Sequence, residues 1–361
     1  MARKPAFAAG DKERLDPFVI MTGEASPRDQ RDLMERPFFS LSKSPRTRPI
    51  LYRSGDVEVQ VHGLPEHGMA TIWDADLLIW AASQIVDAEN HGLRTSRLLR
   101  FTPYQVLTAI GRATGSTEYR LFKAALRRLQ STVVATTIRQ GEQWRRHQFS
   151  WINEWEELSA RNGRVEGIEV ILPDWFYRGV VDRSLVLTID PLYFRLTGGL
   201  ERWLYRVARK HAGRQPDGWV FEMAHLHHKS GSVLRPSDFA LAIRRVVGRQ
   251  PLPGYRLLLE RQAGRERLRL LPREAVLLLS REEAVQARDA VDPAVDRVGT
   301  SLASPVGISL APGSGDHSRG VAANPLGIRL CADPNLDSNP DSNFLAQDDA
   351  RTGKTLRAGR P

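Results

Sequence analysis

Cationic side chains recur at helical spacing within Thr102–Ile152, and their placement indicates a binding chemistry. Three stand at i, i+3 and i+7 with a fourth beside them: Arg120, Lys123, Arg127 and Arg128. Apolar residues follow the same period on the opposite side, at Phe122, Ala125, Leu126 and Leu129. Guanidinium and ammonium groups bind phosphate oxygens, so this helix predicts a polyanion-binding surface. The simpler alternative is an amphipathic helix whose charges are only solvated.

Further cations extend this pattern. Arg145 and Arg146 follow the first group, and a second group comprises Lys229, Arg235, Arg244, Arg245, Arg265 and Arg267. We expect these residues to contact DNA, without separating phosphate contacts from base contacts. Ser116, Gln130 and Ser237 are candidates for contacts with base edges, because hydroxyl and amide groups can pair with them.

Two short patterns could indicate enzyme chemistry, and neither is retained. His225-Leu226-His227 has the His–apolar–His spacing with which metal-dependent nicking enzymes hold a divalent ion. Here the segment is predicted to be helical, and residues at i and i+2 do not share a helix face. Gly353-Lys354-Thr355 resembles the end of a phosphate-binding loop, but Asp348 stands where the upstream glycine is required. We therefore expect no catalytic residues, no metal site and no cofactor.

The elements that position the first cationic group are predicted by local signals. Thr102-Pro103 starts a helix, since a hydroxyl caps it and proline suits the first position. Gly111 and Gly115 bracket a turn, and a second helix follows. Alternating β-branched residues over Thr132–Arg139, a turn, and Trp144–Ile152 predict a hairpin. Helix, turn, cationic helix and basic hairpin together predict a winged helix.

The segments before this module contain further predicted elements. Arg36–Pro49 combines Phe38 and Phe39 with a basic, proline-punctuated stretch, which is either a strap packed on the body or an arm along phosphates. Ile50–His62 alternates and predicts a strand pair, and Thr71–Asn90 predicts an apolar helix beneath the helix-turn-helix. We expect the tryptophans to lie in the core rather than to stack on bases.

The same order of elements is predicted a second time. Leu200–His211 and Val220–His228 are predicted helices, and residues 229–232 form the turn. Pro236–Val247 is a helix with Arg244 and Arg245 on its outer side, followed by a hairpin over Tyr255–Leu271. The predicted fold is α+β, with two tandem winged-helix domains at 36–182 and 183–280. Residues 1–35 are expected to be a disordered lead-in, and 281–361 a disordered low-complexity tail.

Composition is consistent with a polyanion partner. The 361 residues carry a formal net charge of +10, and residues 1–280 hold 43 Lys and Arg against 31 Asp and Glu. Excess positive charge on the folded part indicates nucleic acid first and an anionic membrane second. Cys331 is the single cysteine, and neither a signal peptide nor a membrane-spanning run is apparent. We expect a soluble cytoplasmic protein that does not bind a membrane.

The tail contains imperfect repeats. SPVGISL at Ser304–Leu310 returns as NPLGIRL at Asn324–Leu330, and Asp337-Ser338-Asn339 returns as Asp341-Ser342-Asn343. One hypothesis is that the repeat belongs to the DNA, so that the gene's own 3′ portion carries binding sites for the protein. The alternative is chance similarity in a low-complexity segment.

Long stretches also resemble a known family. They include RPFFSL at Arg36–Leu41, PEHGMATIWDADLLIWAASQI at Pro65–Ile85, FSWINEWEEL at Phe149–Leu158, LTIDPLYFRLTGGLERWLYRV at Leu187–Val207 and HHKSGS at His227–Ser232. The chain resembles the plasmid replication initiator protein A family over most of Arg36–Leu271, without the tail. The resemblance implies an initiator that binds repeated sites at a plasmid origin, helps to open the adjacent duplex and recruits the host initiator and replicative helicase. It also implies that a homodimer can form.

The sequence thus predicts a non-enzymatic, sequence-specific binder of double-stranded origin DNA. Within binding proteins, the alternative is a transcriptional repressor that uses the same two winged helices. The alternative from another class is the metal-dependent nicking initiator considered above.

Overall fold

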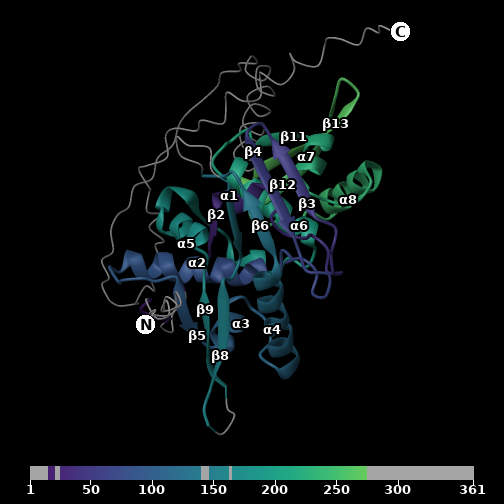
Figure 1. Cartoon of the computed structure of the whole chain (residues 1–361). Helices are drawn as coiled ribbons and strands as arrows, with labels where there is room; N and C mark the ends of the chain where they lie inside the picture. Colours follow the sequence, from purple (N-terminus) through teal and green to yellow (C-terminus); the bar gives the residue numbers. More distant parts are fainter. Residues whose placement is uncertain (1–14, 21–24, 140–145, 162–164, 275–361) are drawn as a thin grey trace, which may run out of the picture. The chain divides into compact units, whose positions relative to one another are not determined.

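The computed structural model describes residues 15–20, 25–139, 146–161 and 165–274, all within one compact unit, residues 1–292 (Figure 1). The fold is mixed α+β, as predicted. Arg145 and the whole of the tail with its repeats lie outside the described residues. Within the described ranges, every helix is too short or too polar to cross a membrane.

The first helix pair forms as the sequence predicts. Helix α2 (Ala75–Asn90) is buried on almost every side and is followed by strand β5 (Leu98–Phe101), α3 (Pro103–Ala109) and α4 (Ser116–Ser131). The Thr102 hydroxyl accepts a hydrogen bond from the Gln105 amide, and the Gln105 side chain returns to the Thr102 backbone in a capping box. Helix α4 buries its predicted apolar stripe, which leaves the cationic stripe outward.

The hairpin after α4 forms, but it joins an unexpected sheet. Its strands are β6 (Val133–Thr136) and β7 (His147–Ser150). They extend the pair β3 (Ile50–Ser54) and β4 (Val57–His62) into a four-stranded sheet of order β3-β4-β6-β7. Val59 pairs with Thr136 and Val133 with Ser150. The hairpin therefore makes no pairing with β5, the strand that precedes the two helices.

A second hairpin takes that place. Strands β8 (Glu154–Ser159) and β9 (Val165–Ile171) pair with β5 and the short β1 (Phe18–Val19) in the order β1-β5-β9-β8. The sequence does not predict β8, because the strand shows no simple alternation: Trp155 and Leu158 are half-buried on opposite faces, and three of its six residues are glutamates. Helix α5 (Asp174–Val181) and a 3₁₀ turn η2 (Arg183–Leu185) follow.

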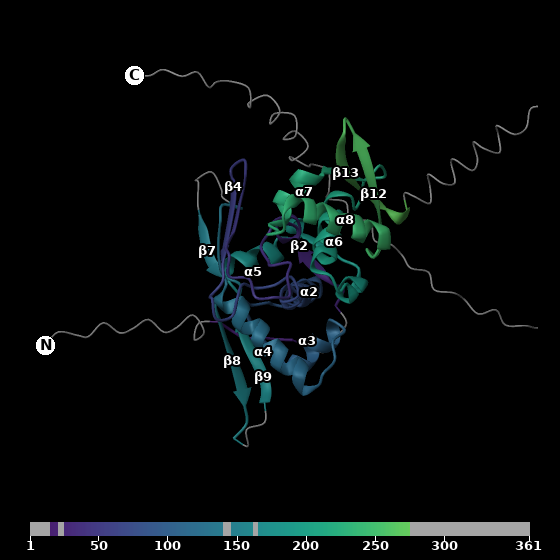
Figure 2. The ribbon, with the colours of Figure 1, turned by 90° about the vertical axis from the view of Figure 1, so that its right-hand side faces the viewer.

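The later part of the chain repeats this arrangement. Helix α6 (Gly199–His211) precedes β11 (Trp219–Glu222), α7 (Met223–Ser230) and α8 (Pro236–Arg249), and β12 (Tyr255–Gln262) and β13 (Arg265–Pro272) close the group. The sheet order β11-β13-β12 matches β5-β9-β8 strand for strand. Figure 2 shows α3 and α4 with β8 and β9, and α7 and α8 with β12 and β13. One prediction is corrected: Val220–Glu222 is a strand, and the helix begins only at Met223.

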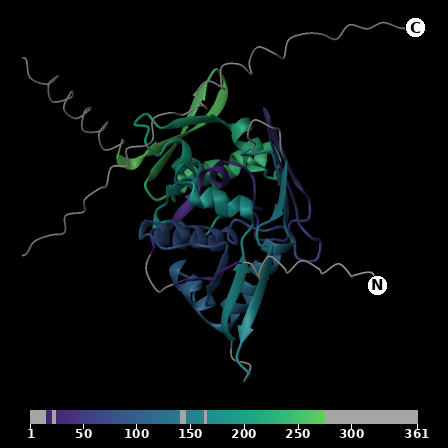
Figure 3. The ribbon, with the colours of Figure 1, turned by 60° about the vertical axis from the view of Figure 1, so that its left-hand side comes forward.

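The prediction that residues 1–35 are disordered is also corrected, for residues 28–35. Strand β2 (Arg28–Gln30) pairs antiparallel with β10 (Val186–Thr188), and α1 (Arg31–Glu35) packs on α6 (Figure 3). Leu33 and Met34 are fully buried, as are Phe38 and Phe39 of the strap that follows. The segment is too short and too charged to show a period, and it is ordered by tertiary partners from the distant half of the chain. A 3₁₀ turn η3 (Pro191–Arg195) then leads into α6.

Buried ion pairs join α6 to the first half of the chain. Arg206 Nε lies 2.6 Å from Asp29 Oδ2 of β2, and both side chains are 2% exposed. One turn earlier on α6, Arg202 lies 2.6 Å from Asp76 of α2, which also accepts a bond from Arg112 at 2.9 Å. Each carboxylate is out of water and depends on its guanidinium partner.

Removing one member of the Arg206–Asp29 pair should be costly. We expect Arg206→Met to lower the free energy of unfolding by about 3–5 kcal/mol, because Asp29 would be left charged and buried. The double variant Arg206→Met with Asp29→Leu should lose less than the single variant. Urea denaturation measures both. Arg235→Met, which breaks an exposed pair with Asp238, is the matched control and should cost under about 1 kcal/mol. Additive losses in the double variant would contradict the interpretation.

Candidate nucleic-acid interface

Helix α4 presents two exposed arginines. Arg120 and Arg127 make no ion pair or side-chain hydrogen bond among the described residues, and they lie two turns apart on one face. Between them Lys123 Nζ is 2.5 Å from Glu157 of β8. With Pro103, Ser116 and Tyr119 these cations line a shallow groove of about 450 Å³. The groove is open, apolar at its base and cationic along one side, which suits a sugar–phosphate backbone.

Arg128 has a different environment from Arg127. Its guanidinium donates two hydrogen bonds to Asp74, at 2.8 and 2.7 Å. Asp74 stands at the N-terminus of α2 and also accepts a bond from the Thr71 amide. The bonds to Asp74 outweigh partial burial and raise the pKa of Arg128. Arg128 therefore fastens α4 to α2, and we do not retain it among the DNA-contacting residues.

The hairpins beside α4 differ in charge. Arg146 is exposed near the tip of β6–β7, 3.8 Å from Glu58 of β4, and Arg145 beside it lies outside the described residues. The β8–β9 hairpin, which pairs with β5, carries glutamates instead, at positions 154, 156, 157, 166 and 169. The basic charge thus lies on the β6–β7 hairpin, whereas the pairing with β5 is made by the β8–β9 hairpin.

The second cationic face is partly neutralised. Arg244 donates two hydrogen bonds to Glu266, at 2.9 and 2.8 Å, which ties α8 to the β12–β13 hairpin. Arg265 and Arg267 approach Glu222 of β11, at 3.7 and 3.2 Å. Arg235 is 83% exposed and pairs with Asp238. The side chain of Arg245 is exposed and unpaired among the described residues.

The three proposed base-contacting residues fall into two kinds. Ser116 and Ser237 are exposed in the first turn of α4 and α8 respectively, so they occupy nearly equivalent places in the two groups. Gln130 lies at the far end of α4, is half-buried, and donates weakly to the Asn153 carbonyl at 3.5 Å. The repeated position favours the serines over Gln130.

The environment of Lys229 differs from what a DNA-contacting residue would have. Lys229 is 7% exposed and its ammonium lies 3.1 Å from Glu35 of α1. Lys210 and Arg36 also pair with Glu35, and His211 Nε2 lies 2.8 Å from it. Burial alone would raise the pKa of Glu35, but the bond from His211 and the charges of Arg36, Lys229 and Lys210 outweigh it and hold the pKa far below its usual value. No local pattern predicts this cluster, because Glu35 is far along the chain from Lys210, His211 and Lys229.

The histidines considered as metal ligands have structural partners. The His225 ring stacks on Phe221 with centroids 5.9 Å apart, and His227 Nε2 lies 2.8 Å from the Leu234 carbonyl. His228 packs on Tyr52 and approaches the Arg53 carbonyl at 3.1 Å. In the ranges that the structure describes, no three His, Cys, Asp or Glu side chains gather in a way that could hold a metal ion. The basic strap is also engaged, since Arg46 donates to the Gly231 carbonyl at 2.7 Å.

The fold and the two cationic helix pairs define a mixed α+β protein built on a repeated strand–helix–helix–hairpin group. Comparison with known proteins then gives the family. The model of the family described as "Replication initiator protein A" matches residues 28–257. The chain belongs to the replication initiator protein A family.

Individual similar proteins agree with this family. A curated protein of Wigglesworthia glossinidia brevipalpis, named "Putative replication protein", is 30% identical over 262 residues, which are 71% of this chain and 94% of that protein. Two crystal structures of domains 2 and 3 of RctB are also similar. One, a selenomethionine derivative, gives a TM-score of 0.49 at 12% identity over 66% of this chain and 95% of that one. The other gives 0.45 at 13% identity over 68% and 98%.

The Glu35 cluster predicts a pH dependence of stability. Burial, with help from Lys229 and Lys210, lowers the pKa of His211 to about 4 despite its bond to Glu35. The unfolded chain takes up this proton near pH 6.5, so between about 4 and 6.5 the unfolded state binds more protons. The free energy of unfolding should therefore rise with pH across this window, by up to about 1.4 kcal/mol per pH unit.

Urea denaturation at a series of pH values measures this slope. His211→Gln keeps a donor for Glu35 but removes the titration, so its slope between pH 4 and 6.5 should be shallower. His62→Gln, on the exposed face of β4, is the control and should keep the original slope. Glu35 contributes separately: its stabilisation is present above its unfolded pKa and is lost as the pH falls below about 4.5. Equal slopes in both variants and the unchanged chain would refute the assignment to His211.

Proposed function

We propose that the chain is a non-enzymatic initiator of plasmid replication that binds double-stranded origin DNA through two winged helices. The observation that carries the proposal is the repeated group in which α4 and α8 each place exposed arginines on an outer face. Family membership supports the replication role, and the net charge of +10 supports an anionic partner.

Each repeated group has the element order of a winged helix. In the first group these elements are β5, α3, α4, β8 and β9, and in the second they are β11, α7, α8, β12 and β13. By strand pairing, the wing of the first group is β8–β9 rather than the basic β6–β7 hairpin. In this reading β6–β7 is an insertion between recognition helix and wing, and Arg146 reaches DNA from a separate sheet.

The contacts divide by their chemistry. Three arginines are free to neutralise phosphates: Arg120, Arg127 and Arg245. Two more, Arg235 and Arg265, have weak, exposed carboxylate partners, which a DNA phosphate can replace. Ser116 and Ser237, at the start of the two recognition helices, are placed for base contacts. Phosphate contacts supply affinity, and base contacts supply the choice of sequence.

The proposed role includes repeated sites at the origin, opening of the adjacent duplex, and recruitment of the host initiator and replicative helicase. These steps rest on the family, and dimer formation is proposed on the same basis. A repressor that uses the same two winged helices is the alternative within binding proteins. For the nicking alternative, cleavage of origin DNA with Mg²⁺ or Mn²⁺ that is lost on His227→Ala would establish the enzyme.

Substitution of the free arginines should weaken binding and reduce its salt dependence. We expect Arg120→Ala and Arg127→Ala each to lower the slope of log affinity against log salt concentration by about 0.9, the contribution of one phosphate contact. Fluorescence anisotropy measures this slope on DNA fragments that tile the protein's own gene and its flanks. The same fragments test whether the DNA that encodes the tail carries binding sites. Arg183→Ala removes an exposed arginine outside both helix pairs and is the control. Equal, weak binding to every fragment would exclude a site-specific function.

The spacing of the two contacted grooves should be fixed. Arg202 and Arg206 anchor α6 to α2 and β2, so the two recognition helices cannot separate freely. Five base pairs inserted between the two protected half-sites rotate one of them by about half a helical turn. We expect the affinity to fall to that of a single half-site, while ten base pairs should restore little because the distance is also fixed. Unchanged affinity with either insertion would show that the two helix pairs move independently.

A further inference from the structure

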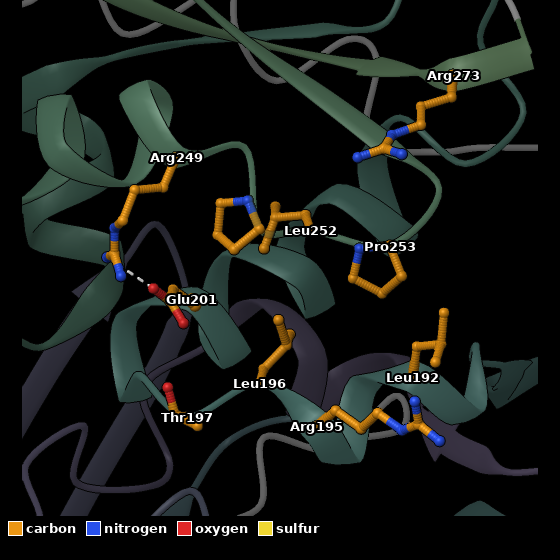
Figure 4. Close-up of a pocket in the computed structure, with 10 residues that line it drawn as sticks. Leu192, Arg195, Leu196, Thr197, Glu201, Arg249, Leu252, Pro253 and Arg273 are labelled. Atoms are coloured by element: carbon orange, nitrogen blue, oxygen red, sulfur yellow. Dashed lines mark ion pairs between the residues drawn. The ribbon is translucent and has the colours of Figure 1, made fainter.

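A hollow lies at the C-terminal end of α8, and none of the residues assigned to DNA contact lines it. Its walls come from η3, the start of α6 and the loop that joins α8 to β12 (Figure 4). Leu192, Leu196, Leu252 and Pro253 form the apolar part, and the volume is about 450 Å³. Leu196 and Leu252 are buried, whereas Leu192 is 47% exposed and Pro253 is half-buried, so these two offer apolar surface to a partner. An exposed leucine beside a hollow of this size marks a place where a partner's apolar side chain can be covered.

Three arginines surround the apolar part, and two of them have no carboxylate. Arg249 pairs with Glu201 at 2.7 Å, drawn as the dashed line in Figure 4. Arg195 is exposed and makes no ion pair or side-chain hydrogen bond among the described residues. Among the described residues, Arg273 donates only to the Tyr255 carbonyl, at 3.4 Å. Three guanidinium groups against one carboxylate give the rim a net positive charge, which is complementary to an acidic ligand.

The hollow and two of the proposed DNA contacts, Arg235 and Arg265, occupy opposite ends of the same elements. Arg235 stands before the first residue of α8 and Arg249 is its last, so about 20 Å of helix separate them. Arg265 begins β13 at the hairpin tip, and Arg273 follows its base, about 26 Å away along the strand. Arg249 is turned towards Glu201 of α6. Arg245 is nearer, one turn before Arg249, which donates to its carbonyl at 3.3 Å, but it does not line the hollow. The separation of the hollow from Arg235 and Arg265 rests on the proposed function.

We propose that this hollow is a docking site for a protein partner, in the form of an acidic segment that carries a bulky apolar side chain. The apolar side chain enters between Leu192, Leu252 and Pro253, and carboxylates on either side of it pair with Arg195 and Arg273. DNA is the less suitable occupant, since a phosphate backbone offers no apolar group to cover the leucines and prolines. A protein bound in this hollow would be brought to the origin when the chain binds DNA, because the two partners use different residues.

The test uses the full chain and three fluorescein-labelled octapeptides. The first has Leu-Phe flanked on each side by Asp and Glu, the second replaces Leu-Phe by Ser-Ser, and the third replaces the acids by their amides. We expect anisotropy to show binding of the first peptide only. Arg195→Glu with Arg273→Glu should weaken it by about tenfold or more, because two charge-assisted pairs become repulsive. Leu192→Ser should weaken it by about threefold, as expected for a partly exposed leucine.

Arg183→Glu with Arg214→Glu is the matched control, since both are exposed arginines that do not line the hollow, and it should bind the peptide as the unchanged chain does. Thermal unfolding midpoints confirm that each variant folds. Equal binding of all three peptides, or no binding of the first, overturns the proposal. So does displacement of the peptide by origin DNA, or a loss of DNA affinity in the Arg195/Arg273 variant beyond that of the control pair. Peptide binding without any site-specific DNA binding would refute the proposed function and leave the docking site standing.

Discussion

Two buried ion pairs on one helix hold the two halves of this chain together. Arg202 and Arg206 stand one turn apart on α6 and pair with Asp76 and Asp29 of the first half, two carboxylates that are out of water. A buried carboxylate without its guanidinium is far less stable than the same position filled by carbon, so these contacts specify one arrangement rather than merely add stability. Strand β2 pairs with β10, and α1 packs on α6. These contacts and the Arg206–Asp29 ion pair therefore cross the domain boundary that the sequence predicts near residue 182.

The number of lysines and arginines in the sequence is larger than the number that the folded chain leaves available to bind a partner. Arg127 and Arg128 are neighbours of one residue type, yet one is free and the other fastens α4 to Asp74. Lys229 is withdrawn into the Glu35 cluster, and Arg244 is shared with Glu266. A basic composition thus consists of two populations, cations that hold elements together and cations that remain available. Only the second population can respond to salt in a binding measurement.

The helices could be predicted because their signals are local. The Thr102 cap, the apolar stripe of α4 and the proline at the start of α8 act within one or two turns, and each of these helices forms where expected. The choice of strand partner is not local: nothing in Thr132–Ile152 indicates that β6 will pair with β4 instead of β5. Lys229 and the hollow beside Arg195 were unpredictable for the same reason, since their environments are assembled from segments far apart in the chain. The equivalent positions of Ser116 and Ser237, by contrast, follow from the repeated order of elements.

The partners of the N-terminal segment have a consequence for synthesis. Asp29 and Arg206 are 177 residues apart. At usual translation speeds the ribosome needs roughly 10–35 s to make that length, and α6 must also clear the exit tunnel. Throughout this interval α1, with the buried Leu33 and Met34, lacks α6, the helix on which it packs, and Asp29 lacks Arg206. The first half of the nascent chain therefore cannot complete its fold alone, and its apolar N-terminal residues remain accessible to chaperones until the second half emerges.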